Sequence, residues 1–120
     1  MNKHQALYAF WNSFNIPAYD ETTVPDDAVM PYIAYNDYTD SIGQILPMSA
    51  SIYYKTNSWQ DISLKSDLIA QTIGEYYITP IDGGYMWITK GTPFAQRIAN
   101  EDRDIRQVYI NITVEFLTEV

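Results

Sequence analysis

The chain has 120 residues, of which 47% are hydrophobic and 15% aromatic, so we expect one domain over residues 1–120 with a modest core. Fifteen acidic against seven basic residues give a formal net charge of −8, which argues against specific nucleic-acid binding, because affinity for phosphates depends on lysine and arginine. With no cysteine the chain has no disulfide and no thiolate metal ligand, and no run reaches the roughly 20 apolar residues of a membrane span.

The first predicted element is a helix over residues 3–14. Its apolar face has helical spacing and is formed by Leu7, Phe10, Trp11 and Phe14. Pro17 ends the helix, because a residue before proline is pushed out of the helical conformation. Residues 18–30 contain paired aspartates and show no periodicity, so we expect them to form a loop ordered by its contacts.

Two strands are predicted next, over residues 31–38 and 48–56. The first is rich in tyrosine and β-branched residues and opens with a proline, which a strand tolerates at its first position. The second alternates, with one face formed by Met48, Ala50, Ile52 and Tyr54. Residues 39–47 between them are expected to be a long hairpin connection.

A second helix is predicted over residues 58–73. Ser58 and Asp61 resemble a weak capping box, and Gly74 stands where a helix C-terminal glycine belongs. A stripe about 100° wide is expected to face the core, and it consists of Trp59, Ile62, Ser66, Ile69, Ala70 and Ile73. Leu64 and Leu68 lie on nearly the opposite side, where a monomer exposes them to water unless the first helix or the 15–30 connector covers them.

The second half of the chain predicts a hairpin and a final strand. Asp82-Gly83 between residues 76–79 and 84–89 is a strong hairpin signal, and Pro80 confines its strand to an edge or to the strand's end. Residues 90–107 are polar and without a sustained period, so we expect a long functional or binding loop. The last strand, 108–117, turns one face to the core with Val108, Ile110, Ile112, Val114 and Phe116.

The element order α-β-β-α-β-β-β therefore predicts an α+β fold. We expect a mainly antiparallel sheet of about five strands, with two helices packed on one face.

No catalytic or metal centre emerges from the residue types, so we expect neither an enzyme nor a cofactor. His4 is the only histidine and lies near a terminus, where a solvated role is the expectation. Asp26-Asp27 and the acids at 101, 102 and 104 lack calcium-loop spacing. The eleven tyrosines fit a carbohydrate-binding or base-stacking surface, but better fit strand and interface positions.

The remaining signals point to association between subunits. Arginine and aromatic residues are enriched in protein interfaces, and all three arginines fall within the predicted loop. The candidate subunit-interface residues are therefore Leu64, Leu68, Arg97, Arg103 and Arg106.

Three segments carry a family resemblance: NIPAYDETTVPDDAVMPYIAY (15–35), PIDGGYMWITKGTPFAQRI (80–98) and VYINITVEFLTE (108–119). With the YYKTNSW run before the second helix, they resemble tail-terminator or tail-completion proteins of long-tailed phages and prophages, which are also described as minor capsid or head–tail joining proteins. The resemblance covers nearly the whole chain, and it rests on lengths, order and a few residue matches.

The resemblance implies a structural protein of the virion tail or neck, assembled in the host cytoplasm. Such proteins form a homo-oligomeric ring, typically hexameric, which caps the tail tube and docks to the head–tail connector. A ring needs two different subunit surfaces that fit each other. An acidic lumen would let DNA pass without sticking. The alternatives are a head-completion or adaptor protein on the portal side, and a small-ligand or peptide-binding domain that uses a tyrosine-lined sheet face.

Overall fold

The computed structural model describes residues 1–39 and 44–118, which form two helices and a six-stranded curled sheet. In chain order the elements are α1 (Lys3–Trp11), a 3-10 turn η1 (Asn12–Phe14), β1 (Ala18–Asp20), β2 (Tyr32–Tyr35), β3 (Ile45–Lys55), α2 (Gln60–Ile73), β4 (Tyr77–Ile81), β5 (Gly84–Ile98) and β6 (Ile105–Thr118). The strand order is β1-β2-β3-β6-β5-β4. The β1–β2 pair is parallel and the other pairs are antiparallel, which confirms the α+β fold class.

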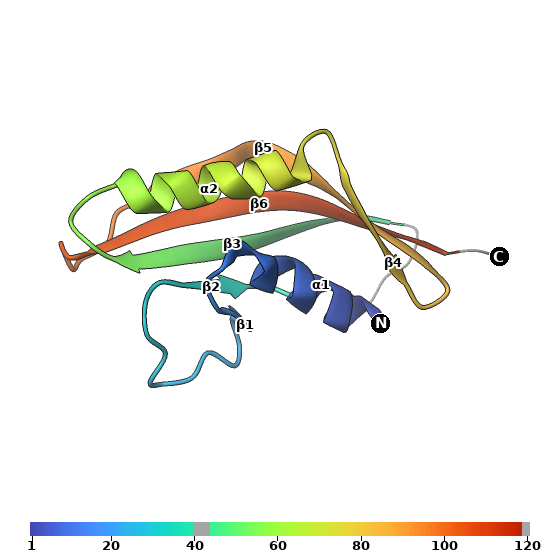
Figure 1. Cartoon of the computed structure of the whole chain (residues 1–120), viewed down its shortest axis with the longest axis horizontal. Helices are drawn as coiled ribbons and strands as arrows, with labels where there is room; N and C mark the ends of the chain where they lie inside the picture. The colour runs from blue at the N-terminus through green and yellow to red at the C-terminus, as the bar shows by residue number, and fades with distance from the viewer. Residues whose placement is uncertain (40–43, 119–120) are drawn as a thin grey trace.

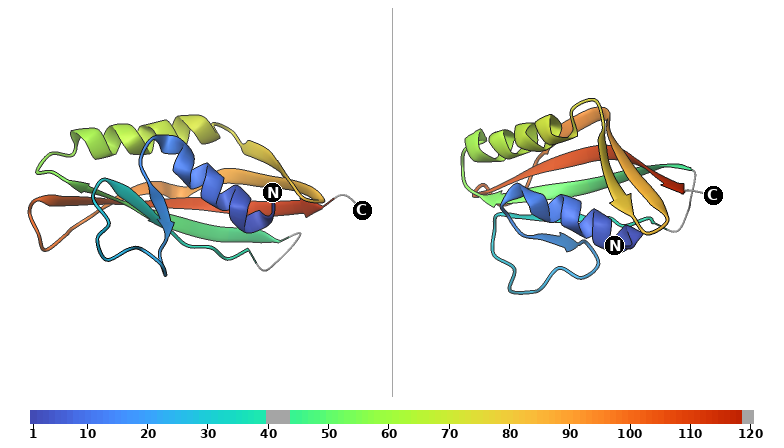
Figure 2. Two further views of the ribbon diagram at one scale, coloured as in Figure 1. Left: turned by 60° about the horizontal axis from the view of Figure 1, so that its bottom comes forward. Right: turned by 45° about the vertical axis from the view of Figure 1, so that its right-hand side comes forward.

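Both helices pack on the same face of the sheet, here called the inner face (Figures 1 and 2). Strand β6 lies between β3 and β5, and the predicted core face of this strand is fully buried: Val108, Ile110, Ile112, Val114 and Phe116. Residues paired across the sheet point to the same side, so Met48 on β3 joins Ile112 in the core. The outer face of the sheet carries the alternate residues, and no described helix covers it.

The two helices begin and end differently from one another. At α1, Asn2 accepts from the Gln5 N–H while the Gln5 side chain accepts from the Asn2 N–H, which completes a capping box. The capping box predicted at Ser58 is wrong, because α2 begins after Trp59 without a side-chain cap, and the Ser58 hydroxyl accepts from the Gln60 N–H instead.

The predicted end of α2 is confirmed. Gly74 adopts φ 57°, and its N–H donates to the carbonyl of Ala70 at 2.9 Å. Four of the six predicted core-stripe residues of this helix, Ile62, Ser66, Ile69 and Ile73, are buried, and the other two, Trp59 and Ala70, are half-buried.

The predicted loop over residues 90–107 is wrong. Strand β5 continues to Ile98 and β6 begins at Ile105, so only residues 99–104 connect them. The register shifts between Lys90 and Ala95, where β5 bulges. The side chains in this half of β5 are mostly exposed, so the sequence shows no apolar alternation there. The strand forms through its backbone pairing.

Two smaller expectations also change. The segment after α1 is not wholly a loop, because its first residues form β1 beside β2. The hairpin connection predicted over 39–47 lies earlier in the chain, because β2 ends at Tyr35 and β3 begins at Ile45; residues 40–43 of that connection lie outside the described residues.

Candidate functional site

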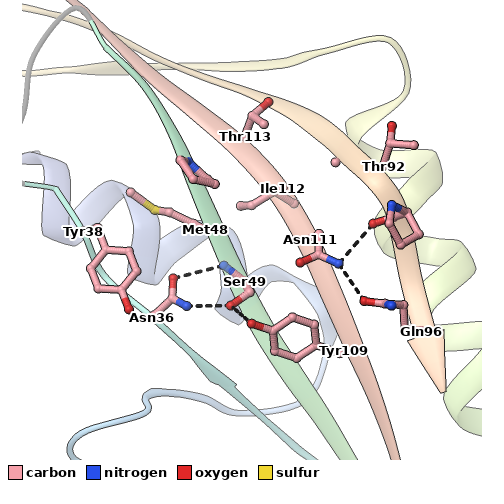
Figure 3. Close-up of a pocket in the computed structure, with 13 residues that line it drawn as sticks. Asn36, Tyr38, Met48, Ser49, Thr92, Gln96, Tyr109, Asn111, Ile112 and Thr113 are labelled. Carbon is pink, nitrogen blue, oxygen red and sulfur yellow. Dashed lines mark hydrogen bonds between the residues drawn. The ribbon is translucent and has the colours of Figure 1, made fainter. Parts of the chain in front are cut away.

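The outer face of the sheet contains a groove of about 550 Å³ beneath the β5 bulge (Figure 3). Its floor is formed by β3 and β6, and its walls by the chain after β2 and by residues 91–93 of β5. The side chains that line it are neutral, and the polar ones among them include Asn36, Ser49, Gln96, Tyr109 and Asn111. The groove therefore offers hydrogen-bonding groups and aromatic surface, without a charge.

A hydrogen-bond network fixes the side chains of this groove. The Ser49 hydroxyl accepts from Asn36 Nδ2 and from Tyr109 Oη, each at 2.6 Å, and the Ser49 N–H donates to Asn36 Oδ1 at 3.0 Å. On the other side, Asn111 Nδ2 donates to the Pro93 carbonyl and to Gln96 Oε1, both at 3.1 Å. Hydrogen bonds between these groups therefore fix their positions along the groove.

The outer face near β4 is apolar instead. The ring of Trp87 on β5 packs against that of Tyr76, with centroids 4.8 Å apart and ring planes tilted by 39°, and Ile78 pairs with Trp87 across the strands. We call the outer-facing residues Ile45, Tyr76, Ile78, Tyr85 and Trp87 the apolar outer patch. This patch was not among the predicted surfaces, although the runs YYIT and GYMWIT have apolar residues on both faces of their strands and could have indicated it.

The two predicted interface leucines are exposed on α2. Leu64 is 60% exposed and Leu68 37%, and they flank a hollow of about 390 Å³ with Tyr54, Asp61 and Lys65. The Lys65 ammonium donates to the Phe14 carbonyl at 2.6 Å, which ties α2 to η1. Even so, neither α1 nor the following connector covers the leucines.

The three predicted interface arginines have different surroundings. Arg97 and Arg106 lie over the ring of Trp59, at 4.7 and 5.3 Å from its centroid. Arg106 also donates to the carbonyls of Arg103 and Asn57, at 2.8 and 2.9 Å. The Arg103 side chain is exposed at the tip of the β5–β6 hairpin and bonds to no described residue. The structure therefore brings two of these arginines together within the chain and leaves the third free.

Among the titratable groups that the structure describes, His4 and Tyr35 have the most distinctive surroundings. The His4 ring lies 2.8 Å from the Asp37 carboxylate and 2.9 Å from the Thr39 hydroxyl, but its side chain is largely exposed. Burial, followed by the charges of Asp20 and Asp37, raises the pKa of Tyr35 to about 12, so its hydroxyl stays protonated. Within residues 1–39 and 44–118 no cluster of histidine and carboxylate ligands could hold a metal ion, and no helix is long and apolar enough to cross a membrane.

Each edge of the sheet has a feature that disfavours the addition of a further strand. At β1, the side-chain amide of Asn12 donates to the Ala18 carbonyl at 3.2 Å and accepts from the Ala18 N–H at 2.9 Å. At β4, Pro80 lacks an N–H, and the Met1 carbonyl accepts from the Asp82 N–H at 2.8 Å. Association by strand addition at β1 or β4 is therefore disfavoured, and faces and tips are the available surfaces.

Comparison of the chain with protein-family models, with curated proteins and with solved structures finds no significant match. The functional argument consequently depends on the surfaces described above. These surfaces are the exposed leucines of α2, the apolar outer patch, the arginine-bearing hairpin tip and the neutral groove.

Proposed function

We propose that this protein is a structural assembly protein of a phage virion. In this role it forms a homo-oligomeric ring that ends the tail tube and joins it to the head–tail connector, and it performs no catalysis. The observation that carries the proposal is the uncovered Leu64–Leu68 pair on a helix whose other side packs into the core. Exposed apolar surface of this kind is typical of a protein–protein contact.

The distribution of surfaces supports a ring rather than a symmetric dimer. The leucines lie on the helical side of the molecule, whereas the apolar outer patch belongs to the uncovered sheet face (Figure 2). Two different apolar surfaces on opposite sides suit a head-to-tail contact, which closes into a ring when the rotation per subunit allows it. The net charge of −8 suits a lumen that DNA traverses without binding.

The test is a double substitution, Leu64→Asp with Leu68→Asp. Because the core stripe of α2 is untouched, we expect the far-ultraviolet circular dichroism and the cooperative unfolding of the wild type to be retained. We expect rings seen by native mass spectrometry and negative-stain microscopy to disappear, together with binding to the ends of tail tubes. The matched control is Val29→Asp. It places the same charge at an apolar residue that is 77% exposed in the segment between β1 and β2.

Two outcomes contradict the proposal. A double variant that still forms rings and caps tubes shows that the leucines are not the contact. A double variant that unfolds shows that the pair packs within its own chain. Binding to portal complexes instead of tail tubes would favour a head-completion or adaptor protein, which belongs to the same assembly line.

The groove beneath the β5 bulge favours a second candidate function, the binding of a small neutral ligand or a peptide on the sheet. Its tyrosine and amide groups are hydrogen-bonded to neighbouring side chains and line a hollow of about 550 Å³. Isothermal titration with neutral oligosaccharides and with uncharged peptides tests it. Binding that Tyr109→Phe weakens supports this function, and absence of heat with either ligand class at millimolar concentration rejects it.

A further inference from the structure

A carboxylate without a partner lies in the middle of the apolar outer patch. Glu115 is half-buried on β6, and it forms the floor of a hollow of about 260 Å³ between Ile45 on β3 and Trp87 on β5. It makes no hydrogen bond or ion pair with any residue that the structure describes. Withdrawing a charge from water without a partner is unfavourable, so a cation placed in this hollow would be stabilised.

The walls of this hollow suit a long cationic side chain. Ile45 is 67% exposed and Ile78 44%, so apolar surface extends on both sides of the carboxylate along one row of paired residues. Trp87 presents an aromatic ring, on which a guanidinium stacks more readily than an ammonium. The chemistry therefore favours an arginine whose methylene groups lie on Ile45 and whose guanidinium pairs with the Glu115 carboxylate.

Such an arginine lies at the opposite end of the molecule, in the β5–β6 hairpin. The β5–β6 hairpin end, with Lys55 beside it, holds four of the seven lysines and arginines but only three of the fifteen acids. Arg97 and Arg106 are engaged on Trp59, whereas the Arg103 side chain is free. Arg103 precedes β6, and the strand from Ile105 to Glu115 spans roughly 33 Å, so Arg103 and Glu115 cannot meet within one copy (Figure 1).

We infer that the hairpin tip of one copy, with Arg103 at its end, docks into the Glu115 hollow of a second copy. The inference rests on the proposed self-assembly and names a contact for it. Charge complementarity gives the direction, because the end of the molecule richest in bases meets a carboxylate within apolar surface. The contact is head-to-tail, so each copy uses its tip and its hollow on different neighbours.

Reciprocal charge reversal tests the contact in sedimentation velocity experiments. We expect Arg103→Glu and Glu115→Arg each to weaken self-association about tenfold or more, because each places like charges together. An equimolar mixture of the two variants should associate again, since every tip then meets a hollow of opposite charge. Glu21→Arg is the matched control for Glu115→Arg, because it makes the same charge change at an exposed acid in the segment between β1 and β2.

Glu115→Gln is a second variant at this position, needed because an arginine there could disturb the sheet. It should weaken association without changing the fold. Variants that associate like the wild type, or a mixture that fails to restore association, overturn the inference. If the mixture fails while Leu64→Asp with Leu68→Asp abolishes rings, the proposed function stands and only this contact is rejected. A wild-type chain that sediments as a monomer up to about 1 mM also overturns it.

Discussion

The guanidinium of Arg106 lies 5.3 Å from the centre of the Trp59 ring, and thereby joins the first residues of β6 to the start of α2. Its Nη2 atom donates to the Asn57 carbonyl at 2.9 Å, on the segment that leads into this helix. Arg97 lies over the same ring at 4.7 Å. These arginines therefore help to hold α2 on the sheet, a role that the pattern of charges did not indicate.

Arg106→Ala should lower the free energy of unfolding, whereas Arg103→Ala should not. The first change removes a cation–π contact and three hydrogen bonds from a charged donor, worth about 1–3 kcal/mol together. The second removes a side chain without described contacts, so its effect should stay within about 0.5 kcal/mol. Urea denaturation of both variants measures this, and equal losses would show that the cation–π contact adds nothing.

Ile112→Ala should cost about 2–5 kcal/mol in the free energy of unfolding. Ile112 is 1% exposed in the middle of β6, where it pairs with the buried Met48, so truncation leaves a cavity in the core. Ile45→Ala is the matched control, because this isoleucine is 67% exposed and its loss should cost little. A loss below about 1 kcal/mol at Ile112 would contradict its place in the core.

The elements of the fold that show apolar periodicity in the sequence were predictable. The helices and β6 each bury one regular face, so spacing alone identified their core residues, including Ile62 and Ile110. The edge position of Pro80 also followed from the chemistry of proline. These features depend on residues that lie close together in the sequence, so the sequence alone indicates them.

The features that were missed depend on pairing between distant segments. The second half of β5 pairs with β6 while exposing most of its side chains, so its residues look like a polar loop. Strand β1 has three residues, too few for a periodic signal. The surroundings of Arg97 and Arg106 depend on the position of Trp59, which follows from the tertiary fold. The helical spacing, in contrast, placed Leu64 and Leu68 opposite the core stripe, and the fold leaves both exposed.

Gly91→Ala should destabilise the protein by about 1–3 kcal/mol. A Cβ atom at this position of the β5 bulge would lie 2.9 Å from both the Cβ and the carbonyl oxygen of Asn111, so the two strands would have to separate. Thr92→Ala is the control, since this neighbouring side chain is exposed and its truncation should have little effect. Thermal unfolding of both variants measures the difference, and an unchanged midpoint for Gly91→Ala would show that the bulge relaxes freely.

The stability of the protein should fall between about pH 10 and pH 12, and Tyr35 should be one cause. Burial, reinforced by the charges of Asp20 and Asp37, raises the pKa of Tyr35 from 10.0 to about 12 in the folded state. Its folded pKa is thus above its unfolded pKa, so its contribution is complete below pH 10 and is lost as the pH rises through 12. Burial also raises the pKa values of Tyr32 and Tyr54, which contribute in the same direction.

Tyr35→Phe isolates this contribution, because it keeps the ring that stacks on Trp11 and removes the ionisable hydroxyl. We expect the free energy of unfolding of this variant to fall less steeply than that of the wild type between pH 10 and pH 12. Urea denaturation at closely spaced pH values measures both slopes, and the tyrosinate absorbance of the folded protein should lose one group that titrates near pH 12. Identical slopes for the two proteins would show that the Tyr35 hydroxyl ionises equally readily in the folded and unfolded chains, and that its burial beside two carboxylates does not couple it to folding.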